Sequence, residues 1–239
     1  MLGYLHGFHA GNHADVLKHV VLVHLLDHLG RKTKGWRYVD THAGAGLYDL
    51  RGERARKKAE HEAGIARLVG RADLPPAPAR LVEVVGAFQP EPGTLAVYPG
   101  SPLLALALAR PQDRLELHEL HPAEHAALAA QLAAEPAAEV HRNDGLRAGL
   151  GQPPPPSRRG LVLVDPPYEL KSNYEAVVRF LVKAHRRFAT GTLALWYPVV
   201  DRGRVEALCA ELRASGVPDL LRAELRVRGD REGFGMTGS

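Results

Sequence analysis

The sequence predicts an α/β fold built on a doubly wound, mostly parallel sheet. Predicted strands and helices alternate along the 239 residues, which is the order that a parallel sheet requires. Two polar motifs, at 40–46 and 165–168, each come directly after a predicted strand. Because open α/β sheets bind their ligands at the carboxyl ends of strands, both motifs are expected to border one site.

The first predicted helix follows Asn12, a residue type that suits an N-cap, and its apolar pattern continues to about Leu29. A basic turn leads to a short strand at 36–39. That strand ends at Asp40, where the glycine-containing segment 41–46 begins. This order of strand and glycine-rich loop is typical of the first strand of a nucleotide-binding sheet.

The next segment, 51–98, breaks the alternation of strands and helices. Helical patterns at 57–70 and 78–88 are interrupted by several prolines. We predict an inserted helical subdomain here, with residues 1–50 and 99–239 forming the core.

The remaining elements of the core follow in regular order. Alternating or continuous apolar runs predict the strands, and longer apolar-periodic segments predict the helices. The expected strands are 115–119, a short one near Val140, 161–164, 192–197 and 219–228, and the expected helices are 101–110, 122–134, 172–189 and 202–215.

Composition bounds the class of protein. A hydrophobic content of 45% is sufficient for a real core. Cys209 is the single cysteine, so no disulfide framework is expected, and no apolar run is long enough for a membrane span. Because no signal peptide is recognisable, we expect a cytoplasmic protein. We also expect a monomer.

The net charge of +4 is too small to indicate nucleic-acid binding by itself. Basic residues nevertheless cluster at 51–58, 158–159, 183–187 and 222–231. Each cluster is either a phosphate-binding surface or simply a solvated face.

The sequence Asp165-Pro166-Pro167-Tyr168 is suited to methylating an exocyclic amine of a planar base. Such an amine is a poor nucleophile because its lone pair is delocalised into the ring. The Asp165 carboxylate and a backbone carbonyl of the stiff Pro-Pro segment can accept both amine hydrogens and turn the lone pair out of the ring plane. Tyr168 offers a flat surface for a base that has left its stack. An ordinary turn at the end of a strand is the alternative.

The loop containing Gly44 and Gly46 indicates a nucleotide ligand, and alone it would also fit a dinucleotide enzyme. Glu119, at the end of the next clear strand, is the candidate for the ribose hydroxyls, and Asp144 for the adenine amine. Neither a third glycine at dinucleotide spacing nor a phosphate-loop Lys-Ser/Thr is present, which favours S-adenosylmethionine over NAD. For Glu119 and Asp144, helix capping is the alternative.

Histidines crowd the amino-terminal segment. His24 and His28 have a spacing that could bind a metal, but no cysteine and no third ligand at a familiar spacing supports this. We therefore expect no metal site. The segment is more simply read as a border of the active site, where Tyr4 and His6 offer surface for RNA.

The chain resembles the bacterial 23S rRNA (adenine(2030)-N6)-methyltransferase family. The matching stretches are Phe8–His19, Asp40–Gly46, Tyr98–Pro102, Glu119–Pro122, Asp144-Gly145, Arg158–Gly160, Asp165–Glu169, Leu195–Val199 and Gly235–Thr237.

The resemblance implies a class I methyltransferase, Rossmann-like, with a helical insert, using S-adenosylmethionine and acting on 23S rRNA. By family pattern the chemistry is carried by Asp165, beside Pro166 and Tyr168, and Tyr4 touches RNA. By the same pattern, the residues that contact the cofactor or line its pocket are His19, His42, Ser101, Glu119, Asp144, Gly145 and Asp165. Gly44 is added to this set from the loop itself, and Lys18 is a candidate partner of the cofactor carboxylate.

Two rival functions stay open at this point. A DNA adenine-N6 methyltransferase would share the Asp-Pro-Pro-Tyr sequence, but no separate target-recognition domain is recognisable. A non-catalytic RNA-binding protein would not need Asp165 and Glu119. A protein-glutamine methyltransferase is less favoured, because those proteins resemble Asn-Pro-Pro-Tyr.

The family pattern also continues past Gly235-Met236-Thr237 with a last antiparallel strand. We therefore expect residues 1–239 to lack this strand, which would leave the strand at 192–197 with an open edge and 219–228 without a neighbour.

Overall fold

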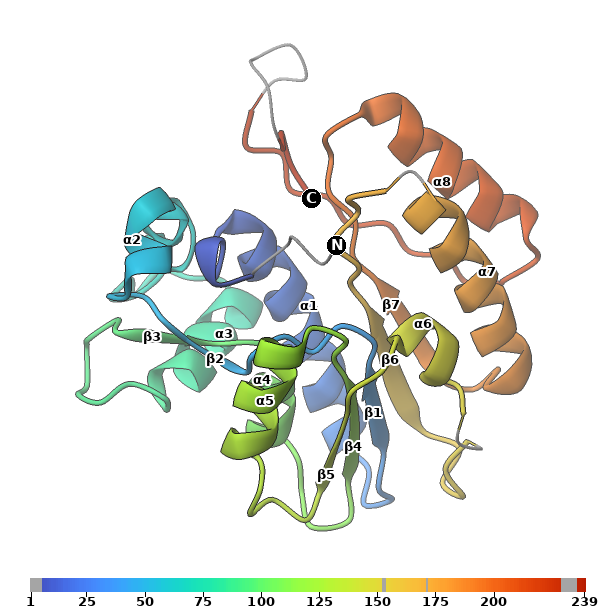
Figure 1. Cartoon of the computed structure of the whole chain (residues 1–239), viewed down its shortest axis with the longest axis horizontal. Coiled ribbons are helices and arrows are strands. Elements are labelled where there is room, and N and C mark those ends of the chain that lie inside the picture. Colours follow the sequence, from blue (N-terminus) through green and yellow to red (C-terminus); the bar gives the residue numbers. More distant parts are fainter. Residues whose placement is uncertain (1–5, 152–153, 171, 229–235) are drawn as a thin grey trace.

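The computed structural model of the chain describes residues 6–151, 154–170, 172–228 and 236–239 (Figure 1). Its strands are β1 (Arg37–Asp40), β2 (Leu47–Asp49), β3 (Val97–Pro99), β4 (Arg114–His118), β5 (Ala138–His141), β6 (Gly160–Val164) and β7 (Thr192–Leu195). Its α-helices are α1 (His13–Gly30), α2 (Glu53–Lys58), α3 (Pro76–Gly86), α4 (Ser101–Ala107), α5 (Pro122–Gln131), α6 (Gly145–Ala148), α7 (Ser172–Arg187) and α8 (Arg202–Ala214). Short 3-10 helices are η1 (His6–Phe8), η2 (Glu60–Ala63) and η3 (Ile65–Arg67).

The main sheet has the order β5-β4-β1-β6-β7, and every neighbouring pair in it is parallel. From β1 the chain proceeds to β4 and β5 on one side, and then crosses to β6 and β7 on the other. The strand order therefore reverses between β1 and β6, and the crevice at their carboxyl ends is where doubly wound sheets bind ligands. The predicted fold class is confirmed.

Side chains on the central strands alternate between two apolar layers, as the period of a strand requires. Tyr38 and Leu163 pack with α1 and α4 in one core cluster, whereas Val39 and Val164 pack with α7 in the other. Figure 1 shows the sheet between these groups of helices. Both faces are covered, which explains the continuous apolar run of β6.

Helix α1 begins where the sequence predicts. The Asn12 side chain accepts hydrogen bonds from the backbone N–H groups of Ala14 and Asp15, both at 2.9 Å. This cap satisfies two of the donors that a helix start leaves unpaired. It fixes the first turns of α1, which carry Asp15 and Lys18, at the edge of the crevice.

The segment between β2 and β3 packs on α1 and not on the main sheet. Helix α3 lies against α1, and Ile65 and Leu81 are fully buried in the core cluster that α1 shares. The antiparallel pair β2–β3 closes the base of this segment. That 51–98 is a subdomain in its own right stays a prediction.

Within this segment the expected helix at 57–70 is wrong. Helix α2 ends at Lys58 because Ala59 adopts a left-handed conformation with φ of 49°, and only the 3-10 turns η2 and η3 follow. The β2–β3 pair was not expected either, because three-residue strands are too short to show an alternating pattern.

The expectation for 219–228 is also wrong. In this stretch only Arg226 takes part in a bridge, so there is no regular strand. The segment 219–228 does have a neighbour. The Leu225 N–H donates to the Ser239 carbonyl, and the Val227 N–H donates to the Thr237 carbonyl. Residues 237–239 run antiparallel to it and also bond to Val199, just beyond β7. Among the described residues β7 itself pairs only with β6, so the predicted open edge of this strand is present.

Across the described ranges, none of the helices has both the length and the apolar character needed to span a membrane.

Candidate active site

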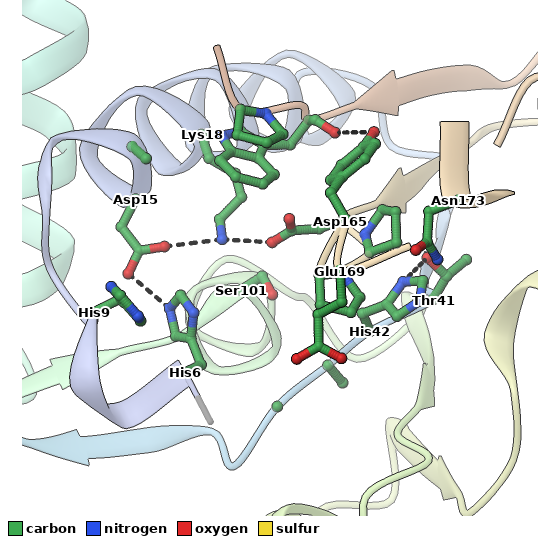
Figure 2. Close-up of a pocket in the computed structure, with 18 of the residues that line it drawn as sticks. His6, His9, Asp15, Lys18, Thr41, His42, Ser101, Asp165, Glu169 and Asn173 are labelled. Carbon is green, nitrogen blue, oxygen red and sulfur yellow. Dashed lines mark hydrogen bonds and ion pairs between the residues drawn. The ribbon is translucent and has the colours of Figure 1, made fainter. Parts of the chain in front are cut away.

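A cavity of about 510 Å³ lies at the carboxyl ends of β1, β4, β5 and β6. The segments after these strands line it, together with η1 and the first turns of α1 (Figure 2). It contains nearly all the residues singled out from the sequence: His6, Lys18, His19, His42, Gly44, Ser101, Glu119, Asp144, Gly145, Asp165, Pro166 and Tyr168. Tyr4 lies outside the described residues.

Asp40, at the end of β1, anchors the glycine-containing loop. Its carboxylate accepts hydrogen bonds from the hydroxyls of Tyr38 and Ser101, each at 2.7 Å, and from the backbone N–H of His42. Burial raises the pKa of Asp40. Its acceptors are thus used to hold the loop, and Asp40 itself does not line the cavity.

The loop turns sharply at Gly44, where φ is +67°. A Cβ atom at this position would collide with the Tyr48 hydroxyl. Glycine therefore lets the backbone form the wall of the cavity.

Glu119, after the neighbouring strand β4, stabilises the Gly44 loop through hydrogen bonds. One carboxylate oxygen accepts from the Gly44 N–H at 2.8 Å, and the other from the His121 N–H at 2.6 Å. Burial raises the pKa of Glu119, although the two backbone bonds oppose this shift. Since each oxygen has two acceptor sites, one on each is left for a ligand.

Asp144 and Gly145 form the next part of the wall. The Asp144 side chain caps α6 by accepting from the Leu146 N–H at 3.0 Å, which was the alternative reading of this residue. A Cβ on Gly145 would overlap the backbone of Thr41, so glycine allows the two loops to meet. Burial lowers the pKa of nearby His42 to about 4, and its Nδ1 lies 2.8 Å from the Thr41 hydroxyl.

The most charged part of the cavity is a chain of ionic side chains under the amino-terminal end of α1 (Figure 2). The Lys18 Nζ atom lies 2.9 Å from Asp15 and 2.6 Å from Asp165. The other Asp15 oxygen lies 2.8 Å from the His6 ring and accepts from the Gly11 N–H. The Lys18 side chain is only 7% exposed.

These contacts determine the charge states. Burial alone would lower the pKa of Lys18, but the charges of Asp15 and Asp165 hold it well above its usual value. Burial would likewise raise the pKa of Asp15, yet His6 and Lys18 hold it well below its usual value. The two carboxylates and the one ammonium sum to one net negative charge, with the His6 ring left aside.

The turn after β6 is rigid. Pro166 and Pro167 follow Asp165, and Tyr168 adopts a left-handed backbone with φ of 52°, uncommon for a residue other than glycine. The Tyr168 hydroxyl donates to the Trp196 carbonyl at 2.8 Å, and its ring packs against those of Tyr174 and Trp196. These contacts tie the turn to the segment after β7.

Some residues of the cavity wall were not expected from the sequence. The centroid of the Trp196 ring lies 5.7 Å from the Lys18 ammonium. The one sequence feature that could have indicated this residue is its place at the end of a predicted strand. Asp15 was noted only as an early residue of the helix. Glu169, at the end of a family-matching stretch, also lines the cavity, as do Asn173 and Arg204, which no sequence pattern marked.

The described residues contain no group of three or more His, Cys, Asp or Glu side chains that could hold a metal ion.

Comparison with known proteins gives consistent results. The sequence pattern of the family described as "Ribosomal RNA large subunit methyltransferase D, RlmJ" matches residues 33–239. The chain is 46% identical over 239 residues to the ribosomal RNA large subunit methyltransferase J of Escherichia coli K12, and 45% identical to that of Haemophilus influenzae Rd. All of this chain is covered in each comparison, and 85% of each relative.

A crystal structure of a protein from Legionella pneumophila has a similar fold. The TM-score is 0.85, with 34% identity, over 96% of this chain and 84% of the other.

Proposed function

Because the chain belongs to the family of ribosomal RNA large subunit methyltransferase D, RlmJ, we propose that it transfers a methyl group from S-adenosylmethionine to the N6 amine of one adenosine in 23S rRNA. Methylation of ribosomal RNA follows from the family. The choice of amine rests on one observation: Asp165, with its Pro-Pro-Tyr turn, faces the cavity at the point where the strand order of the sheet reverses.

Asp165 has the free acceptor that this chemistry needs. Its Oδ2 atom accepts from Lys18, whereas none of the described residues donates to Oδ1. Oδ1 and a backbone carbonyl of the proline turn can accept the two amine hydrogens, so that the nitrogen lone pair points away from the ring. The protein contributes position and electrostatics and forms no covalent intermediate.

The charge and the hydrogen-bond acceptors of the cavity support S-adenosylmethionine as the cofactor. The cofactor supplies an electrophilic methyl on a cationic sulfonium, and the net negative charge of Asp15, Lys18 and Asp165 favours a cation there. Glu119 keeps acceptor sites for ribose hydroxyls, and Asp144 keeps one for the adenine amine. Lys18, His19, His42, Gly44, Ser101 and Gly145 would complete this site.

We expect Glu119→Ala to weaken S-adenosylmethionine binding by about 1–3 kcal/mol, because ribose hydroxyls lose their acceptor and the Gly44 loop loses its fastening. Isothermal calorimetry measures the effect, and Glu211→Ala, an exposed carboxylate on α8, is the matched control. Unchanged affinity in Glu119→Ala would remove this residue from the cofactor site.

RNA is the proposed substrate, with Tyr4 and His6 as proposed contacts. The basic clusters differ in how far their charges are compensated. Arg222 lies within 2.8 Å of Glu206 and 2.6 Å of Glu224, whereas Arg56 and Lys57 on α2 are exposed and form no ion pair with another described residue. Helix α2 also lies beside η1, which lines the cavity (Figure 1). This cluster is therefore the best placed to meet phosphates.

We expect methyl transfer to protein-free 23S rRNA to be faster than to duplex DNA of the same sequence, and RNA affinity to fall steeply with salt as counterions are released. Incorporation of labelled methyl groups into both substrates, from 50 to 200 mM salt, provides the measurement. Faster transfer to duplex DNA would instead support a DNA adenine methyltransferase.

A further inference from the structure

His19 and Tyr98 form a buried pair behind the cavity. His19 is 1% exposed and Tyr98 is fully buried. The Nδ1 atom of His19 lies 2.8 Å from the Tyr98 hydroxyl oxygen, and the rings stack with centroids 5.5 Å apart. His19 comes from the second turn of α1, and Tyr98 from β3, at the end of the inserted segment.

Both rings keep their neutral forms near pH 7. Burial lowers the pKa of His19 to about 3, so the imidazole carries a single N–H. Burial also raises the pKa of Tyr98 well above its usual value, so the phenol keeps its proton. The two neutral rings therefore share one hydrogen bond. Which ring donates depends on the other hydrogen-bond partners that each ring has.

The direction follows from the surroundings of the Tyr98 hydroxyl. His19 is the hydrogen-bond partner recorded for it, and a buried O–H that donates to nothing is costly. The hydroxyl therefore donates, and Nδ1 of His19 accepts. The imidazole proton must then lie on Nε2.

The Nε2 atom is buried and has no hydrogen-bond partner among the described residues. His19 lines the cavity and Tyr98 does not, and Nε2 is the ring nitrogen on the side away from Tyr98. Other donors nearby are engaged: Lys18 with Asp15 and Asp165, and the Ser101 hydroxyl with Asp40. The Nε2–H group is thus a donor without an acceptor.

The position of this donor along the cavity indicates its acceptor. Asp144 and Glu119 mark the nucleoside end of the proposed cofactor, and Asp165 marks the transferred methyl. The part of the cavity under α1 is left for the amino-acid portion, whose carboxylate is an acceptor.

We propose that Tyr98 is a positioning residue, which fixes the His19 ring as the Nε2–H donor to the carboxylate of S-adenosylmethionine. This inference rests on the proposed function, and it adds a residue of the inserted segment that does not touch the cofactor. Lys18, the preceding residue of α1, lines the same cavity, and its ammonium would also attract a carboxylate. Tyr98 would therefore affect binding of the amino-acid portion only.

The test compares two ligands that differ in that portion. S-adenosylhomocysteine carries the carboxylate, whereas 5′-methylthioadenosine has the same nucleoside without it. In calorimetry, Tyr98→Phe should weaken S-adenosylhomocysteine about fivefold, the size of one neutral hydrogen bond, and leave 5′-methylthioadenosine unchanged. In a His19→Phe background, Tyr98→Phe should add no further loss, because the two residues act as a unit.

A spectroscopic measurement on the unmodified protein is independent of the variants. With ¹⁵N-labelled histidine, the His19 ring should show its proton on Nε2 and an unprotonated Nδ1. A proton on Nδ1, or equal changes for both ligands in Tyr98→Phe, or no change for either, would overturn the role of Tyr98. If the wild-type protein bound neither ligand, the proposed cofactor would itself be wrong, and the inference with it.

Discussion

Asp165→Ala is expected to lower the rate of methyl transfer by at least about 10²–10³-fold, the effect of removing one preorganised hydrogen-bonding group from a transition state. The carboxylate is the acceptor that localises the lone pair of the amine, and it is held at 2.6 Å by Lys18. S-adenosylhomocysteine should still bind, because Glu119, Asp144 and the Gly44 loop do not depend on Asp165.

Two further variants sharpen this prediction. Asp165→Asn keeps the size of the side chain but loses the charge, so it should also be strongly impaired. Glu169→Ala removes an exposed carboxylate from the same cavity wall and should retain most of the activity. Single-turnover rates separate chemistry from binding, and Asp165→Ala with near wild-type single-turnover rates would refute the assigned role.

Lys18→Met is expected to lower the free energy of unfolding at pH 7 by about 3–5 kcal/mol, the usual cost of removing one partner from a buried ionic pair. Asp15 and Asp165 would remain without their shared cation. Denaturant unfolding measures the effect, and Lys32→Met, at an exposed position after α1, is the control.

The pH dependence of this effect follows from the pKa values. In the wild-type protein the pKa of Asp15 is lowered by folding, so its contribution to stability is present above its unfolded value and is lost as the pH falls through the folded value. In Lys18→Met, Asp15 loses one of the charges that hold its pKa down, so burial raises that pKa above its value in the wild-type protein, and protonation then relieves the penalty. The difference between the two proteins should therefore shrink on acidification, and a constant difference would contradict this explanation.

The sequence was sufficient to predict the fold because the strands of the main sheet carry continuous or alternating apolar side chains and are followed by polar loops. Asp40, Glu119, Asp144 and Asp165 each follow one such strand, and the parallel arrangement brings their loops to one edge. The predictions failed for short elements. The β2–β3 pair has three residues per strand, and the helix at 57–70 was ended by the backbone of Ala59.

The sequence could not predict which side chains from distant parts of the chain contact each other. Lys18 and Asp165 are 147 positions apart, and His19 and Tyr98 are 79 apart. Each of these residues lies in a recognisable motif, but nothing in a motif says which side chain in another motif it touches. The sequence proposed Lys18 as a partner of the cofactor carboxylate, which stays a prediction, but it could not show that the ammonium also lies between two aspartates.

The most direct test of the proposed activity is to identify the methylated nucleoside. The purified protein is incubated with deuterium-labelled S-adenosylmethionine and with 23S rRNA from a strain that lacks the enzyme, and the RNA is digested and analysed by mass spectrometry. We predict labelled N6-methyladenosine at a single position, and none with Asp165→Ala. Label in any other nucleoside, or equal labelling by the variant, would contradict the assignment of this site to adenosine N6 methylation.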